Sequence, residues 1–307
     1  MLDPEVAAFV ARTEELYPAS MNTAPVAENR AAYDRMCAAF RRPYPPGIWA
    51  EDEPLAVDAP HRHLAIRRYR GARRRSGPIL LYLHGGGFVL GGLHSHDDVC
   101  AELCDQASIE VAALDYRLAP EHPYPAALDD SEAAFRWLLR EGRRVVVGGD
   151  SAGGNLTAAL CLRLRRLGLP QPAGQLLIYP GLGGDISNRD APLLTAGNSA
   201  HYRSLYGGGA DRIPADDPEF APLRARDFRG LPPAAIFAAG LDPLVGDAAE
   251  YAERLVGDGV AARLRIEEGL VHGYLRARCS SRRAADSFAA IVTALSDLWR
   301  SKLKGSA

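Results

Sequence analysis

The sequence has no long apolar run and almost no net charge. Its 307 residues include no stretch near the ~18 consecutive apolar residues of a membrane-spanning helix, so no membrane span is expected. The 36 basic and 38 acidic residues give a formal net charge of −2, a balance that does not indicate nucleic-acid binding. The first ten residues carry two acids and no basic residue, which is unlike a secretory signal.

Sulfur is also scarce, with three methionines and an odd number of cysteines, Cys37, Cys100, Cys104, Cys161 and Cys279. An odd count at irregular spacing argues against a disulfide framework. Cys100 and Cys104 lie one helical turn apart, which suits a metal or redox pair, but no further ligand cluster lies near them in the sequence. We therefore predict reduced, buried thiols in a cytoplasmic protein.

What the sequence does contain is a series of short apolar runs separated by amphipathic helical patterns such as 129–140 and 154–167. Most of the runs lack alternation, as strands buried on both faces do. This pattern predicts an α/β fold with a mostly parallel sheet and helices on both faces. The predicted strands are 63–69, which alternates, and 79–83, 111–115, 145–149, 175–180, 234–240 and 262–268.

Two segments lie outside this alternation. Residues 5–17 and 29–40 have helical patterns, and the prolines of 41–49 then end them, so we assign 1–50 to an N-terminal helical segment and 51–307 to the main domain. The second segment, 181–231, separates two predicted strands and is far longer than an ordinary connection, which is typical of lids and binding loops.

The strongest motif is VVVGGDSAGGNL, residues 145–156, in which G-x-S-x-G lies between an apolar strand and a helix. This context is that of a nucleophile elbow, which presents the hydroxyl of Ser151 at a sharp turn. The amino end of the following helix directs N–H groups and a positive dipole toward the same place. We therefore predict that Ser151 is a catalytic nucleophile.

A serine hydroxyl needs a base to take its proton, and the base is in turn oriented by an acid. Two histidines follow Ser151, namely His201 in the long segment and His272 just after the last predicted strand. Asp242 follows a buried strand directly, whereas Asp247, five residues on, is the alternative acid or a charge at a helix start. His272 and Asp242 are the favoured pair, because both follow strands as the α/β-hydrolase order requires.

The run LHGGGFVLGG, residues 83–92, has five glycines in ten residues directly after a predicted strand. Glycines let a substrate lie against the main chain, whose N–H groups stabilise a developing oxyanion. The HGGG pattern assigns these donors to Gly86 and Gly87, joined by Ala152 after the nucleophile. His84 is then expected to order the loop by hydrogen bonds.

Taken together, these motifs resemble the hormone-sensitive lipase family of α/β-hydrolases in its compact esterase form. The resemblance implies an eight-stranded sheet and a cap formed by 1–50 and by 181–231, inserted after the sixth strand. It also places the triad on Ser151, Asp242 and His272, acting without metal or organic cofactor. It rests on 84–91, 115–130, 149–156, 242–244 and 272–274.

The predicted function is hydrolysis of small carboxylic esters through an acyl-enzyme. An amidase or formamidase would use the same triad and stays open, and a ligand-binding receptor is disfavoured because this chain retains His272. Few large apolar residues and the polar run Asp185, Asn188, Arg189 and Asp190 predict short acyl chains of two to six carbons. A homodimer is allowed, and neither nucleic acid nor a metal ligand at His94 or His96 is expected.

The loop 115–125, DYRLAPEHPYP, carries unlike charges at close spacing. From this spacing and the resemblance, we expect Asp115, Arg117 and Glu121 to form an ion network that braces the site.

Overall fold

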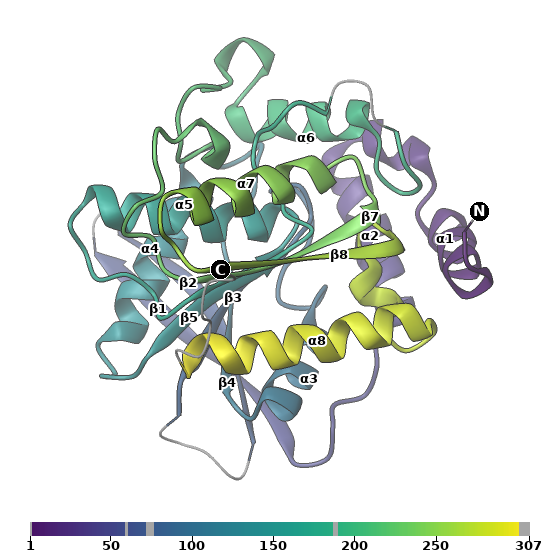
Figure 1. Cartoon of the computed structure of the whole chain (residues 1–307). Coiled ribbons are helices and arrows are strands. Elements are labelled where there is room, and N and C mark those ends of the chain that lie inside the picture. Colours follow the sequence, from purple (N-terminus) through teal and green to yellow (C-terminus); the bar gives the residue numbers. More distant parts are fainter. Residues whose placement is uncertain (1, 59–60, 72–76, 187–189, 301–307) are drawn as a thin grey trace.

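A twisted eight-stranded sheet forms the centre of the computed structural model, which describes residues 2–58, 61–71, 77–186 and 190–300 (Figure 1). The strands lie in the order β1-β2-β4-β3-β5-β6-β7-β8, and all pairs are parallel except β1–β2 and β2–β4. The predicted α/β fold is thus confirmed. The strands are β1 Ile48–Asp58, β2 His61–Gly71, β3 Ile79–Leu83, β4 Glu110–Asp115, β5 Val145–Asp150, β6 Gln175–Ile178, β7 Ala234–Leu241 and β8 Ala262–Val271.

Strand β1 is the element that the apolar pattern did not reveal. Its sequence IWAEDEPLAVD is acidic and contains a proline, because it is an edge strand that pairs only with β2. It begins at Ile48, so the sheet starts three residues before 51, the first residue of the predicted main domain.

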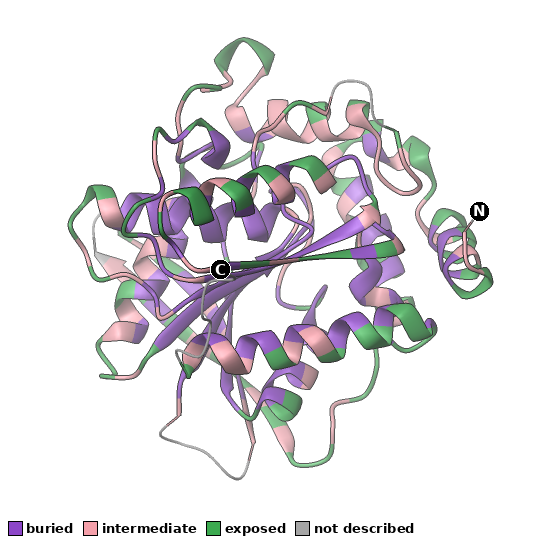
Figure 2. Cartoon of the chain, in the orientation of Figure 1, coloured by how far each residue is buried: buried purple, intermediate pink, exposed green. Residues whose placement is uncertain are grey.

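Helices cover both faces of the sheet. Helices α3 and α8 lie on one face, and α4, α5 and α7 lie on the other (Figure 1). Every residue of β3, β5 and β6 is buried as a result, which explains their unbroken apolar runs (Figure 2). The helices are α1 Pro4–Leu16, α2 Val26–Phe40, α3 Asp97–Ala107, α4 Ala126–Leu139, α5 Ala152–Arg166, α6 Ala196–Gly207, α7 Val245–Gly257 and α8 Arg282–Trp299.

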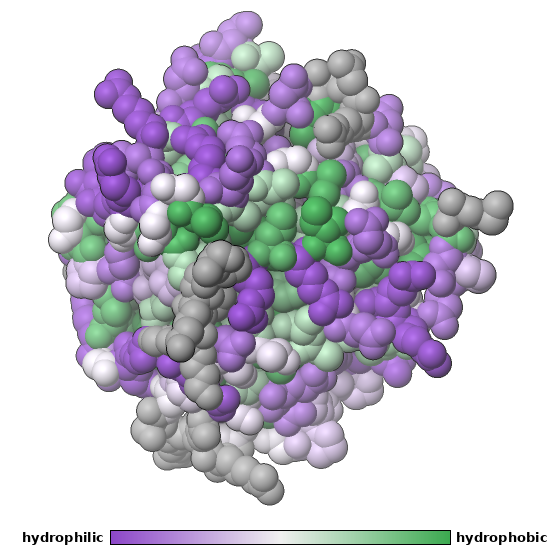
Figure 3. Space-filling view, in the orientation of Figure 1, coloured by the Kyte–Doolittle hydropathy of each residue, from purple (hydrophilic) through white to green (hydrophobic). Residues whose placement is uncertain are grey.

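Strand β8 forms the other edge of the sheet and is only partly covered. Its residues are a mixture of buried, intermediate and exposed ones, unlike those of the central strands. Leu241 and Ile266 are among the few large apolar side chains exposed to solvent. Figure 3 shows hydrophobic side chains in a band across the face on which β8 lies.

Two segments far apart in the sequence meet beyond the carboxyl ends of the strands. Tyr202 of α6 donates a hydrogen bond to Oδ1 of Asn22, at 2.8 Å, in the short helix η1 (Ala19–Thr23) between α1 and α2. The Tyr202 hydroxyl also lies 3.2 Å from the hydroxyl of Tyr17 and accepts from Nδ2 of Asn29 at 3.4 Å. These four side chains, which we call the latch, join the N-terminal helices to the insertion.

The prediction that Asp115, Arg117 and Glu121 form an ion network in the loop after β4 is wrong. Arg117 pairs with Asp130 of α4, at 2.8 Å between Nη2 and Oδ1, and Glu121 pairs with Arg30 of α2 at 2.7 Å. Asp115 forms an ion pair with neither of its supposed partners. The side chains of Arg117 and Glu121 therefore reach α4 and α2 instead of one another.

Candidate active site

The turn between β5 and α5 holds Ser151 in a strained conformation, with φ 53° and ψ −116°. The flanking glycines permit it, because a Cβ at Gly153 or at Gly149 would lie 1.8 Å or 2.2 Å from the carbonyl oxygen of Leu83. The Ser151 amide donates to the carbonyl oxygen of Ile178 at 2.9 Å, which fixes the turn against β6. The local geometry is therefore that of a nucleophile elbow.

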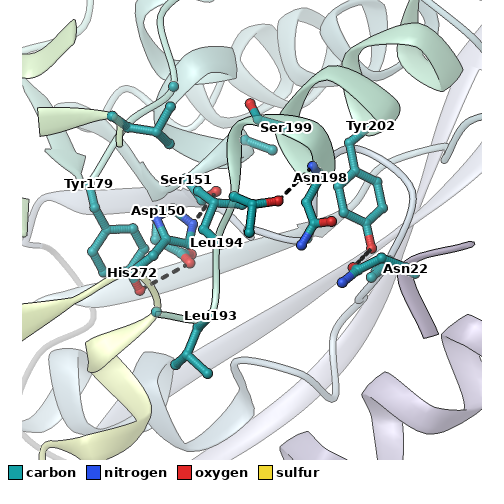
Figure 4. A pocket seen from close by; sticks show the side chains of 18 of the residues that line it. Asn22, Asp150, Ser151, Tyr179, Leu193, Leu194, Asn198, Ser199, Tyr202 and His272 are labelled. Carbon is teal, nitrogen blue, oxygen red and sulfur yellow. Dashed lines mark hydrogen bonds between the residues drawn. The ribbon is translucent and has the colours of Figure 1, made fainter. Parts of the chain in front are cut away.

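The structure brings the favoured base and acid to this serine. Nε2 of His272 lies 2.9 Å from Oγ of Ser151, and Nδ1 of His272 lies 2.7 Å from Oδ2 of Asp242. The Asp242 side chain is buried, and its Oδ1 accepts the Leu244 amide at 2.9 Å. Ser151 and His272 face the cavity side by side in Figure 4.

The two alternative residues lie elsewhere. His201 is on α6, where its ring packs against Tyr202. Oδ2 of Asp247 accepts the backbone amides of Leu182 and Gly184, at 2.6 and 3.2 Å, and so fixes the start of the insertion. Burial raises the pKa of Asp247, although these amides oppose the shift.

The glycine loop after β3 requires its glycines for steric reasons. Gly86 has φ 127°, and a Cβ there would lie 2.2 Å from the carbonyl oxygen of Leu90. The same turn is closed by a hydrogen bond of 2.8 Å from the Leu90 amide to the Gly86 carbonyl. Within the described chain, the amides of Gly86, Gly87 and Ala152 donate no hydrogen bond. All three residues border the cavity beside Ser151.

Sequence reasoning missed a buried carboxylate that supports this loop. Oδ1 of Asp150 accepts the Gly85 amide at 3.0 Å and the Tyr82 hydroxyl at 2.8 Å. Its Oδ2 lies 3.2 Å from Nε2 of His96 and accepts the Tyr179 hydroxyl at 3.3 Å. Burial raises the pKa of Asp150, but His96 and the other partners outweigh it, so the pKa lies below its ordinary value. The only sequence signal was the position of Asp150 inside G-x-S-x-G.

His84 makes the hydrogen bonds expected of a structural residue. Its ring stacks on Tyr116, with the ring centroids 4.2 Å apart, and Nδ1 contacts the carbonyl oxygen of Gly85 at 2.8 Å. The Tyr116 hydroxyl donates to the His84 carbonyl oxygen at 2.7 Å. Burial, together with the nearby His96, lowers the pKa of His84 to about 4. The imidazole is therefore neutral near pH 7.

A cavity of about 330 Å³ lies in front of Ser151, between the N-terminal helices and the insertion. One wall is largely apolar and includes Phe9, Tyr33, Met36 and Leu193. The other is the inner face of α6, where Asn198, Ser199 and Tyr202 point inward (Figure 4), followed by Arg203 and Tyr206. Asn188 and Arg189 of the polar run lie outside the described residues.

The metal site, the cysteine pair and the membrane span considered from the sequence can each be compared with the structure. In the described chain, no three or more His, Cys, Asp or Glu side chains are grouped to hold a metal ion. Cys100 and Cys104 are buried and unbonded to each other, as predicted, but Cys279 is exposed, contrary to the prediction of buried thiols. None of the described helices is both long and apolar enough to cross a membrane.

Comparison with known proteins identifies the family of the chain. A family model for the alpha/beta hydrolase fold matches residues 80–276. Esterase LipI of Mycobacterium tuberculosis is 40% identical over 251 residues, which cover 76% of this chain and 78% of LipI. An esterase of the bacterial hormone-sensitive lipase family has a TM-score of 0.84 and 28% identity, covering 97% of this chain and 99% of that one.

The chain belongs to the hormone-sensitive lipase family of α/β-hydrolases. It is accordingly an enzyme of the carboxylic ester hydrolase class. Another member, the ethyl acetate hydrolase of Pseudomonas putida, is 34% identical over 247 residues, covering 76% of this chain and 78% of the relative. All the motifs that suggested the family lie within the matched residues 80–276.

Proposed function

We propose that this family member is a serine carboxylesterase in which Ser151, His272 and Asp242 form the catalytic triad. The observation that carries the proposal is the pair of contacts of one imidazole, 2.9 Å from Nε2 to Oγ of Ser151 and 2.7 Å from Nδ1 to Oδ2 of Asp242. With Nδ1–H donated to Asp242, Nε2 carries the free lone pair that can accept the serine proton.

The reaction then follows from the geometry. As Oγ of Ser151 attacks the ester carbonyl carbon, its proton moves to Nε2, and Asp242 stabilises the imidazolium. The carbonyl oxygen becomes an oxyanion, for which the amides of Gly86, Gly87 and Ala152 are the proposed donors. The C–O bond to the alcohol breaks as His272 protonates the leaving oxygen. His272 then takes a proton from a water molecule, whose oxygen attacks the acyl carbon. The bond from that carbon to Oγ breaks, the acid leaves, and His272 returns the proton to Oγ of Ser151.

We also propose that residues 1–50 and the insertion 181–231 form a cap over the catalytic domain, 51–307. Both segments line the cavity, and the latch joins them. A volume of about 330 Å³ lies at the small end of the range for ligand sites, roughly 300–1,000 Å³. It suits short acyl chains of two to six carbons, and the relative named ethyl acetate hydrolase acts, by its name, on such an ester.

The test is a series of p-nitrophenyl esters from acetate to palmitate. Each methylene gains about 0.8 kcal/mol while there is apolar wall to bury it, so kcat/KM should rise briefly and then fall. Ser151→Ala should lose activity by about 10⁴–10⁶-fold while remaining folded. An optimum at octanoate or beyond contradicts the short-chain proposal, and an active Ser151→Ala contradicts the nucleophile.

The same assay separates the alternatives. Matched p-nitroanilides of the preferred acyl groups distinguish an esterase from an amidase or formamidase, because the triad serves both. Covalent labelling of Ser151 by a fluorophosphonate distinguishes an enzyme from a ligand-binding relative. The contact of His272 with Ser151 supports the first of these two functions.

A further inference from the structure

The arginines that are at least partly buried, in the part of the chain that the structure describes, are paired with carboxylates with two exceptions. Among the described residues, every arginine that is at least partly buried has a carboxylate oxygen within 4.0 Å, except Arg203 and Arg276. Both exceptions line the cavity in front of Ser151. A partly buried cation is costly unless it is paired, so the cavity holds two charges that the described chain leaves without an ion pair.

Arg276 is bound to the N-terminal helices. Its Nη2 donates to the Tyr33 hydroxyl at 2.7 Å and contacts Sγ of Cys37 at 3.3 Å. The guanidinium lies 5.2 Å from the centre of the Tyr33 ring, and its Nε is buried without an acceptor. These contacts fix Arg276 against α2, which leaves it little freedom to bind a ligand.

Arg203 differs from Arg276 because no described residue accepts a hydrogen bond from its side chain. The guanidinium lies over Phe220, with Cζ 5.8 Å from the ring centre. It follows Asn198 and Ser199 by about one helical turn, and all three line the cavity. Its nitrogen atoms are not sealed from solvent as Nε of Arg276 is. Arg203 therefore presents an oriented and unused donor set to the cavity.

Asp247 does not satisfy this charge. It attracts Arg203 through space, but no oxygen of Asp247 lies within 4.0 Å of the guanidinium. Its Oδ2 already accepts two backbone amides. Burial lowers the pKa of Arg203, the direction expected for a cation that has lost water without gaining a partner.

We propose that Arg203 binds an ionised carboxylate carried by the substrate, so that the preferred esters are those with a second, anionic carboxylate. The guanidinium fork matches a carboxylate with two parallel hydrogen bonds, and the amide of Asn198 and hydroxyl of Ser199 offer further donors beside it. The inference rests on the proposed ester hydrolysis. Two substrate types fit: half-esters of short dicarboxylic acids and acylated hydroxy acids.

The experiment compares matched esters in a pH-stat at one pH. Monoethyl glutarate against ethyl valerate places the charge on the acyl side, and 3-acetoxypropionate against propyl acetate places it on the alcohol side. The readout is the ratio of kcat/KM for the charged ester to that for the neutral one. The proteins are the wild type, Arg203→Met, Arg203→Lys and the control Arg224→Met, which removes an exposed, nearby cation that does not line the cavity.

In at least one pair, the wild type should prefer the charged ester, and Arg203→Met should lower the ratio by about tenfold to a hundredfold. Arg203→Lys should give an intermediate ratio, since a lysine cannot form the bidentate pair. Arg224→Met should keep the wild-type ratio. A neutral-ester preference in the wild type for both pairs, or equal ratios in wild type and Arg203→Met, overturns the proposal.

A binding arm separates this proposal from the proposed function. Glutarate should raise the melting temperature of the wild type and of Arg224→Met, but not that of Arg203→Met, whether or not any ester is cleaved. If the wild type hydrolyses no ester, the proposed function fails, while glutarate stabilisation that requires Arg203 still supports the anion site. Equal stabilisation of all variants, or of none, contradicts it.

Discussion

Replacing Asp242 with asparagine should inactivate the enzyme. The Leu244 amide, which Asp242 accepts on the side away from His272, decides which way the asparagine side chain faces. Oδ1 of Asp242 accepts the Leu244 amide at 2.9 Å, while Oδ2 faces Nδ1 of His272 at 2.7 Å. An asparagine keeps its single oxygen toward the Leu244 amide and so turns its NH₂ group toward His272. Nδ1 must then accept, the ring proton moves to Nε2, and Nε2 can no longer take the proton of Ser151.

The expected loss in kcat/KM has two causes. Turning the amide over leaves a buried N–H without an acceptor, which costs about 1–3 kcal/mol, or roughly 10- to 100-fold in rate. The charge that stabilises the imidazolium is lost as well, and the combined loss in kcat/KM should approach the ~10⁴-fold seen when a serine protease triad suffers the same change. The melting temperature should change little, because the replacement is isosteric.

The matched control is Asp247→Asn. Oδ2 of Asp247 alone accepts the amides of Leu182 and Gly184, and the single oxygen of asparagine can accept both. This variant should therefore keep kcat/KM within a few-fold of the wild type. The assay is p-nitrophenyl butyrate hydrolysis, with circular dichroism to check folding. A loss under tenfold in Asp242→Asn, or a larger loss in Asp247→Asn, refutes the reasoning.

Three further predictions follow from the site. Since the folded pKa of His84, about 4, lies below the ordinary 6.5, its contribution to the free energy of unfolding is complete above pH ~6.5 and falls by roughly 2–3 kcal/mol toward pH 4.5. Urea titrations at pH 7.5 and 4.5 should show a smaller difference in His84→Gln, and an equal difference contradicts the shift. Gly86→Ala should lower kcat by about 10²–10³-fold, because its Cβ would meet the Leu90 carbonyl at 2.2 Å. Gly142→Ala, in an open turn with φ 67°, should leave kcat unchanged, and equal kcat in both variants disproves the steric account. Deleting residues 1–45 should raise KM and lower the melting temperature while Ser151 still reacts with a fluorophosphonate, whereas an unchanged substrate profile means that the N-terminal helices are not part of the site.

Sequence patterns predicted the central strands because burial on both faces leaves them uniformly apolar, as in β3 and β5. They failed at β1, where an edge position allows acids and a proline. The candidate triad was predictable because chain order and strand ends confine its members. The partners of Asp150 and of Arg117 were not predictable, because the paths of the loops decide which side chains come into contact. The predicted cytoplasmic location and homodimer stay predictions.

The latch also affects how the chain folds during its synthesis. Asn22 and its partner Tyr202 are 180 residues apart, and Tyr33 and Arg276 are 243 apart. At about 5–20 residues per second, the ribosome delivers Tyr202 roughly 10–40 s after Asn22. During that interval the apolar side chains of α1 and α2, including Phe9 and Met36, have no cavity to line and are exposed to chaperones and to other nascent chains. The first part of the protein to be synthesised is therefore among the last to reach its native contacts.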